Sequence, residues 1–294
     1  MLWTQSLGLN LKQSEVDFVI PDLSRDLHLY VDPLLFYRSS LTSYQEVHAL
    51  LHQFFATAID AVKNGNAYVA ERMLDFPEVK ETMLGMAKHS HKGRGMGDSK
   101  GRVIFDEIVG NTDVLDKGIT HLAEMQLLID GVGYDLISDM CTNIAKVFFI
   151  NYTQHQCRLH GIALENGICL EHVFNWNEME WDDINTDLPI NPESEQPILL
   201  VPKDVVRRFP VFDFEDFWNT TYRYILRNNV LSSSVKSIGK QPKVYWKDIN
   251  KKFNFCKKTV VQVLHQHPEL RHIYVDKFES SGDPTLTAEP IVID

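Results

Sequence analysis

Residues 131–150 read GVGYDLISDMCTNIAKVFFI. At about 100° per residue in an α-helix, the polar side chains of this segment fall within an arc of roughly 100°. They are Asp135, Asp139, Thr142, Asn143 and Lys146. Apolar side chains fill most of the opposite side, so the segment predicts an amphipathic helix that buries one broad face. Two carboxylates then lie one turn apart beside a lysine.

This polar stripe has two interpretations. Gly131 and Gly133 allow a tight turn, and Asp135 then lies in the first helical turn, where the helix dipole favours an anion. A metal or phosphate site fits this pattern. A solvated helix face has the same spacing, and both interpretations stay open at this point.

Composition indicates a soluble, globular chain. With 294 residues, 44% of them hydrophobic, it forms one large domain or two modest ones. No apolar run reaches the roughly 18 residues that span a bilayer, and the first residues lack the pattern of a signal peptide. We therefore expect a cytoplasmic protein without a membrane partner. The four cysteines have no zinc-site spacing and are expected to be reduced thiols near the core.

Charge is distributed unevenly along the chain. The net charge is −11, yet the segment from Arg223 to Lys277 holds 12 Lys and Arg against 3 Asp and Glu. We predict a main globular domain over residues 1–231 and a basic helical region over residues 232–294. Such a region meets an anionic partner or docks on the acidic surface of its own chain.

The first 102 residues predict strands, then helices, then a loop. Strands are expected at 16–20 and 27–31, and the second ends at Asp32, a carboxylate that points into a cleft or forms a turn before Pro33. Helices are expected at 43–62, 67–74 and 78–86. In the loop that follows, glycines alternate with cations. Its candidate phosphate-binding residues are Lys92, Gly93, Arg94 and Gly95, although the loop matches neither a P-loop nor a Rossmann fingerprint and is also typical of a plain surface loop.

The middle of the chain is acidic. Strands are expected at 167–170 and 197–203, with a polar loop over 176–192 between them and a helix over 204–209. Lys203 ends an apolar run, where restriction-type nucleases carry a lysine, but Val201 replaces the carboxylate that normally stands two residues earlier. The pattern as a whole favours a helix-dominated α+β or α/β fold with a small mixed sheet and a helical, basic C-terminal region.

Three runs resemble an uncharacterised bacterial family that occurs near phage-defence and mobile-element genes. They are Gly131–Asp139, Phe149–Cys157 and Leu199–Asp204. The resemblance implies a role in antiviral defence against invading DNA, as one component of a multi-protein system. It implies no particular activity.

Two functional hypotheses follow. In the first, the chain is a metal-dependent nuclease or phosphodiesterase in which Asp135 and Asp139 hold Mg²⁺ or Mn²⁺ with Asp32. Lys203 or Lys146 then stabilises the phosphate, and the glycine-cation loop guides nucleic acid. In the second, the chain is a non-catalytic sensor or adaptor that binds a partner protein, with the polar stripe as an interface and the acidic middle as a docking surface.

Overall fold

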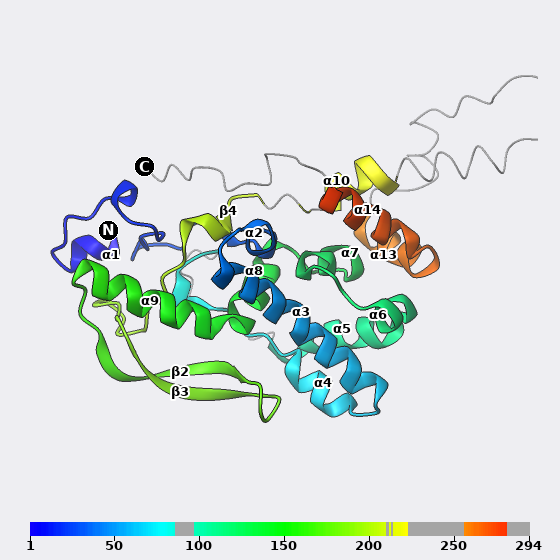
Figure 1. The fold of residues 1–294 in the computed structure, drawn as a ribbon, viewed down its shortest axis with the longest axis horizontal. Helices are drawn as coiled ribbons and strands as arrows, with labels where there is room; N and C mark the ends of the chain where they lie inside the picture. The colour runs from blue at the N-terminus through cyan, green and yellow to red at the C-terminus, as the bar shows by residue number, and fades with distance from the viewer. Residues whose placement is uncertain (86–96, 210–211, 213, 223–255, 281–294) are drawn as a thin grey trace, which may run out of the picture.

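The computed structural model describes residues 1–85, 97–209, 212, 214–222 and 256–280. Within residues 97–110 it describes the side chains from residue 101 on. Figure 1 shows a helical body with a long two-stranded ribbon along one side and a pair of C-terminal helices at the far end. The helix-dominated α+β class expected from the sequence is confirmed.

Helices make up most of the body. Up to residue 128 they are α1 (Trp3–Ser6), α2 (Pro33–Arg38), α3 (Thr42–Lys63), α4 (Ala67–Met73), α5 (Gly97–Gly110), α6 (Thr112–Lys117) and α7 (Met125–Leu128). Later ones are α8 (Tyr134–Ile144), α9 (Lys146–His160), α10 (Phe214–Phe217), the π-helical turn η5 (Trp218–Tyr222), α13 (Lys257–Gln266) and α14 (Glu269–Ser280). Short 3-10 turns are η1 (Gln13–Glu15), η2 (Lys80–Thr82), η3 (Leu122–Glu124) and η4 (Lys203–Val205).

The main core lies between α3 and α8. The apolar face of α3 repeats with the helical period, and Phe54 and Phe55 are almost fully buried. The face predicted for residues 131–150 is buried as expected, through Leu136, Ile137, Met140, Cys141 and Ile144. The single helix predicted for residues 131–150 is divided into α8 and α9, because Ala145 has φ −93° and ψ 17°, outside helical geometry.

Two separate antiparallel strand pairs replace the single mixed sheet that the sequence predicts. Residues Tyr30–Val31 (β1) pair with Val206–Arg207 (β4). The long hairpin pairs β2 (Glu165–Asn175) with β3 (Glu180–Leu188), and Leu170 lies opposite Ile184. The expected polar loop over 176–192 is therefore wrong. From residue 183 to 188, exposed Asp183, Asn185 and Asp187 alternate with the inner positions that include Ile184 and Leu188, which is the period of a half-buried strand.

Other expected elements are shorter in the structure than in the prediction. Segments 16–20 and 197–203 form no strands of their own but run side by side, with the Val19 N–H donating to the Val201 carbonyl at 2.9 Å. Proline at 202 has no N–H for a ladder. The helix expected over 78–86 is only the turn η2, ended by Met83 at φ 54°, and the one over 204–209 is replaced by η4 and β4.

A second apolar cluster joins the C-terminal helices to the body. Phe217, Leu264, Leu270 and Tyr274 pack there with Leu127 of α7. The boundary predicted at 231/232 lies outside the described residues, but the two parts on either side share this cluster. None of the helices in the described ranges is both long and apolar enough to cross a membrane.

Candidate functional site

The polar stripe of α8 and α9 faces another part of the chain. Asp139 Oδ1 accepts the Val79 N–H at 3.1 Å, and Asn143 Nδ2 donates to the Pro77 carbonyl at 2.8 Å. Farther along, the Thr153 hydroxyl accepts the Leu200 N–H at 2.8 Å. The stripe therefore supplies hydrogen-bond partners for backbone groups of two segments that are not strands.

Lys146 is the buried cation of this stripe. It is 2% exposed, and its ammonium donates to the Glu171 carbonyl at 3.1 Å and lies 4.0 Å from Glu81 Oε1. Burial lowers the pKa of Lys146, and nearby carboxylates, Glu81 foremost and then Asp139, oppose that shift. An ammonium enclosed in this way ties three chain segments together and is closed to a phosphate from solvent.

Asp135 differs from Asp139 because it is exposed on the first turn of α8. A Cβ added to Gly85 would stand 3.0 Å from Asp135 Oδ1, and Gly85 has φ +125°, so this close approach requires glycine. Tyr30 lies nearby, and burial, reinforced by the Asp135 charge, raises the pKa of its hydroxyl. The candidate phosphate-binding residues Lys92 to Gly95 lie outside the described residues.

Asp32 is a buried structural carboxylate. It accepts the Leu34 N–H at 3.0 Å as the N-cap of α2, and its other oxygen lies 3.1 Å from Arg207 Nε. Asp32 and Arg207 are 2% and 6% exposed. Burial raises the pKa of Asp32, and the Leu34 N–H and Arg207 only partly offset that rise. Its carboxylate fixes the start of α2 against β4 and does not point into a cleft.

Lys203 anchors the N-terminal segment. Its ammonium donates to the backbone carbonyls of Gln13 and Val16. Burial lowers the pKa of Lys203, while Asp17 and Asp204 oppose that change. Lys203, which the sequence predicts beside a phosphate, thus donates to carbonyl oxygens more than 185 positions away in the sequence.

Three of the predicted catalytic residues, Asp32, Asp139 and Lys203, bind groups within the described part of the chain. The structure brings Asp139 and Lys146 together, as the helical spacing predicts, but gives Asp32 and Lys203 other partners. Among the described residues, no three His, Cys, Asp or Glu side chains are placed to hold one metal ion. Asp32 and Asp139 bind groups within the chain through Leu34, Arg207 and Val79. The role of Asp135 and Asp139 in holding Mg²⁺ or Mn²⁺ stays a prediction.

The hairpin β2–β3 carries a surface that no catalytic motif in the sequence indicates. From Leu159 to Pro202 the chain contains no Lys or Arg and nine Asp and Glu. Four exposed carboxylates stand on the two strands, from Glu165, Glu171, Asp183 and Asp187. The long cation-free run was the signal in the sequence that could have found this surface.

Two β-bulges shape the hairpin, and aspartates from β3 stabilise both. Asp187 Oδ1 accepts the Gly167 N–H at 3.1 Å, and Asp183 Oδ1 accepts the His172 N–H at 3.2 Å. The His172 ring stacks on Trp181 at 4.1 Å, and its Nε2 donates to the Asp75 carbonyl at 2.8 Å. Burial lowers the pKa of His172 to about 4, so the ring is neutral near pH 7. The inner face is therefore packed on the body while the outer face stays exposed.

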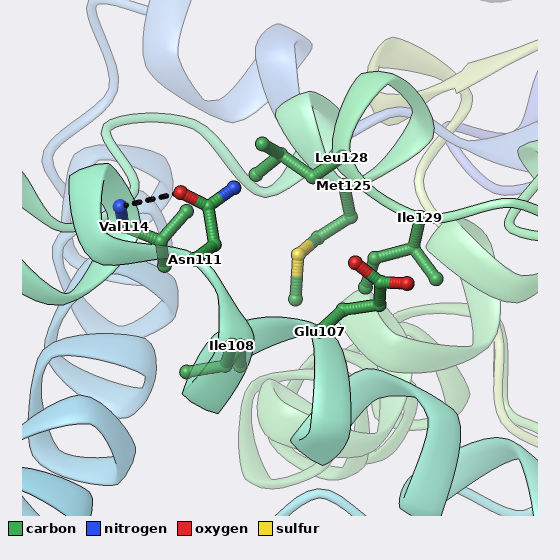
Figure 2. Close-up of a pocket in the computed structure, with 7 residues that line it drawn as sticks. All are labelled: Glu107, Ile108, Asn111, Val114, Met125, Leu128 and Ile129. Carbon is green, nitrogen blue, oxygen red and sulfur yellow. Dashed lines mark hydrogen bonds between the residues drawn. The ribbon is translucent and has the colours of Figure 1, made fainter. Parts of the chain in front are cut away.

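A small crevice lies between α5, α6 and α7. Figure 2 shows Met125, Leu128 and Ile129 opposite Glu107 and Ile108, around about 160 Å³ of space. This volume is below the roughly 300 Å³ at the low end of small-molecule pockets.

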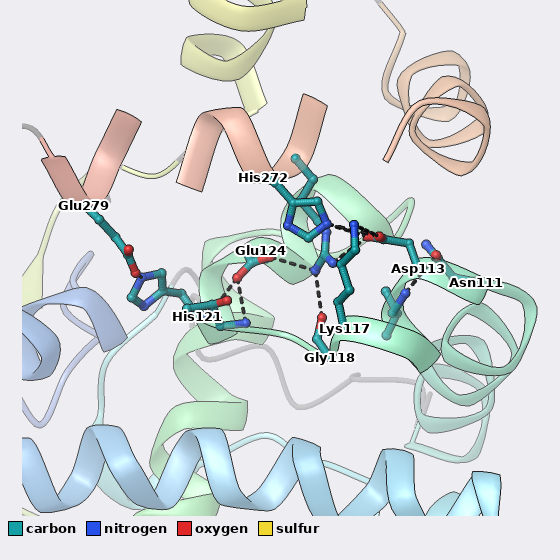
Figure 3. Close-up of polar contacts among 11 residues, drawn as sticks. Asn111, Asp113, Lys117, Gly118, His121, Glu124, His272 and Glu279 are labelled. Carbon is teal, nitrogen blue, oxygen red and sulfur yellow. Dashed lines mark hydrogen bonds and ion pairs between the residues drawn. The ribbon is translucent and has the colours of Figure 1, made fainter. Parts of the chain in front are cut away.

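A network of ions joins α14 to the body (Figure 3). Arg271 is 1% exposed and contacts Asp113 at 2.6 Å and Glu124 at 2.8 Å. His272 lies 3.0 Å from Asp113, and His121 lies 2.9 Å from Glu279. Hydrogen bonds from His272, Arg271 and Lys117 outweigh burial and hold the pKa of Asp113 at about 2. This part of the basic C-terminal region docks on acidic residues of its own chain, one of the two alternatives that its charge left open.

Comparison with known proteins gives the chain a family but no function. No curated protein and no solved structure matches it. The model of one family, described as a domain of unknown function (DUF8370), matches residues 8–213, which include α2 to α9 and the hairpin β2–β3. The chain therefore belongs to the DUF8370 family.

Proposed function

We propose that this chain is a non-catalytic, partner-binding component that docks a basic protein on the outer face of the hairpin β2–β3. The observation that carries the proposal is a contrast: Asp32, Asp139 and Lys203, three of the expected catalytic residues, bind groups within the chain, whereas the carboxylates of the hairpin are exposed. From the resemblance to a bacterial family found near phage-defence genes, we further propose that this component works in a multi-protein defence system.

Charge selects the class of partner. Nine carboxylates without a Lys or Arg between Leu159 and Pro202 repel a nucleic-acid backbone and attract a cationic protein surface. The hairpin is well suited to present them, because Trp181 and Phe174 anchor its inner face on α3 through Phe54. A rigid acidic face speeds encounter with a basic partner and suppresses acidic ones.

The direct test is co-expression of the chain with the products of its neighbouring genes, followed by affinity measurement of the complex. Glu178 is exposed in the turn between β2 and β3. We expect Glu165→Lys with Glu178→Lys to weaken binding at least tenfold, and rising salt to weaken the wild-type complex. The matched control is Glu46→Lys with Asp60→Lys on α3, which makes the same charge change at exposed positions away from the hairpin. Equal binding by both double variants contradicts the proposal.

The competing nuclease hypothesis is tested with the same purified protein. Wild type and Asp135→Ala are incubated with DNA and with RNA in Mg²⁺, Mn²⁺ or EDTA. Asp135 is the informative position, because its carboxylate is exposed whereas Asp32 and Asp139 stabilise the fold. Metal-dependent cleavage by wild type that Asp135→Ala abolishes would replace our proposal with the nuclease.

A further inference from the structure

The two strands of the hairpin differ in the regularity of their edges. β2 has 11 residues and β3 has 9, and both register shifts place the extra residue in β2. A bulge interrupts the row of backbone N–H and C=O groups along its strand, so the edge of β2 is broken twice. In contrast, β3 runs without a bulge from Glu180 to Leu188.

One edge of β3 has no strand beside it in the described part of the chain. Among the described strands β3 pairs with β2 alone, and Figure 1 shows the hairpin at the margin of the molecule. In a two-stranded antiparallel sheet, every second residue of each strand directs its N–H and C=O away from the other strand. Such groups of β3 can pair with a further strand wherever no other element covers them.

The body holds β3 near both of its ends. At one end, Trp181 Nε1 donates to the Arg72 carbonyl of α4 at 3.1 Å. Near the other end, Gln154 Nε2 of α9 donates to the Asp187 carbonyl at 3.0 Å. Residues 182–185 lie between these two attachments. This part of the strand is therefore in place before a partner arrives, which lowers the cost of ordering it on binding.

The charges of this edge select what can pair with it. Natural edge strands are commonly protected from unwanted pairing by lysine, proline or a bulge. The chain contains no Lys or Arg from Leu159 to Pro202, and β3 contains no proline and no bulge. The charges on β3 are all negative, so they repel an acidic strand, including β3 of a second copy, and attract a basic one.

The side chains of β3 define the kind of sequence that fits beside it. Asp183, Asn185 and Asp187 form an exposed row, and Ile184 and Leu188 lie on the inner side. Side chains directly opposite each other on neighbouring strands are about 4.5–5.5 Å apart, so opposite charges can pair there. A fitting strand therefore carries lysine or arginine at every second position and β-branched apolar side chains between them.

We propose that the basic partner adds an extended segment of this alternating kind to the edge of β3, as a third strand of the sheet. This inference rests on the proposed function and specifies how the partner binds. Backbone hydrogen bonds to residues 182–185 supply affinity, and the exposed acidic row supplies the preference for a basic sequence.

The test measures, by fluorescence anisotropy, the binding of a short labelled peptide in which lysine and valine alternate to the full-length protein. We expect this peptide to bind at least tenfold more tightly than one of the same composition with its lysines grouped at one end. The reason is that alternation places the cations along one face of an extended strand. Methylation of every backbone nitrogen keeps the charges but removes the N–H donors, and should weaken binding at least tenfold.

A pair of single variants separates pairing at the edge from a general effect of charge. Asn185→Lys puts a cation into the exposed row of β3, as protected edge strands do, and should weaken binding of the alternating peptide at least tenfold. Asn166→Lys is the matched control, because it makes the same change at an exposed position on β2. It should weaken binding by less than about threefold.

Several results would overturn strand addition. They are no binding of the alternating peptide, equal binding of its methylated form, or equal losses in Asn185→Lys and Asn166→Lys. A wild-type dimer that Asn185→Lys dissociates would assign the edge to a second copy and overturn it as well. The proposed function fails on a different result, which is a co-expressed partner that binds Glu165→Lys with Glu178→Lys as tightly as it binds the control on α3.

Discussion

The stripe on α8 and α9 and the outer face of the hairpin β2–β3 are both rich in carboxylates, yet they have opposite surroundings. Asp139, Asn143 and Lys146 each contact a backbone group or an ion within the chain. Glu165 and Glu171 stand exposed on the hairpin. Polar residues with internal partners stabilise a fold, and those that face solvent remain available for another molecule. Helical spacing alone does not distinguish the two cases.

The largest loss of stability is expected when the buried cation of the stripe is removed. Lys146→Ala should lower the free energy of unfolding by about 2–3 kcal/mol, because it leaves Glu81 and the Glu171 carbonyl without their buried partner. Urea denaturation measures this change. Glu171→Ala is the control, since only its backbone carbonyl contacts Lys146, and its loss should stay below about 0.5 kcal/mol.

Lowering the pH should destabilise the inner face of the hairpin through protonation of His172. His172 has a pKa near 4 in the folded chain against an ordinary value of 6.5, so its contribution is complete above pH 6.5 and is lost as the pH falls toward 4. After allowance for partial exposure, we expect a loss of about 1–2 kcal/mol across that window.

Unfolding free energies at pH 7.5 and 5.0 test this expectation, with His172→Gln as the comparison. The variant should show a smaller difference between the two pH values. Asp113, whose pKa is about 2 in the folded chain, loses its contribution only below pH 3.8 and does not interfere. An identical pH dependence in wild type and variant would remove His172 as the cause.

Within the stripe, the two aspartates should behave differently. Asp139→Ala leaves the Val79 N–H without its acceptor and should cost about 1–2 kcal/mol. Asp135→Ala removes an exposed carboxylate and should change the free energy of unfolding by less than about 0.5 kcal/mol. Urea denaturation measures both changes. Equal losses of unfolding free energy in the two variants would show that the hydrogen bond from Val79 adds no stability.

The smallest effect on stability is expected on the hairpin. Glu165→Lys with Glu178→Lys should leave the free energy of unfolding within about 0.5 kcal/mol of wild type, because both side chains are exposed. A loss above 2 kcal/mol would show that this face also stabilises the fold, and binding results from the variant would then need another explanation.

Local periodicity predicted the helices well. The 3.6-residue repeat located α3 and the buried face of α8, because both pack one face on a common core. The hairpin was harder to predict, because the carboxylates of β3 obscure a two-residue alternation whose inner positions include Ile184 and Leu188.

Long-range partners could not be predicted from the sequence. Asp32 pairs with Arg207, and Lys203 donates to Gln13 and Val16. Nothing in the local pattern of these residues indicates such distant contacts, so a strand-terminal aspartate and lysine looked like a site. The closeness of Asp139 and Lys146 was predictable, since it depends only on helical spacing and on a shared face.

The ion network at Arg271 limits how the chain can be divided. The family match ends at residue 213, yet the buried guanidinium that Asp113 and Glu124 bind, that of Arg271, belongs to residues 256–280. Leu127 also shares its apolar cluster with Leu264, Leu270 and Tyr274 of that segment. A fragment cut at the family boundary would keep two carboxylates in place without their guanidinium and would uncover an apolar patch. Such a fragment should aggregate during purification, so functional experiments need the chain at its full length.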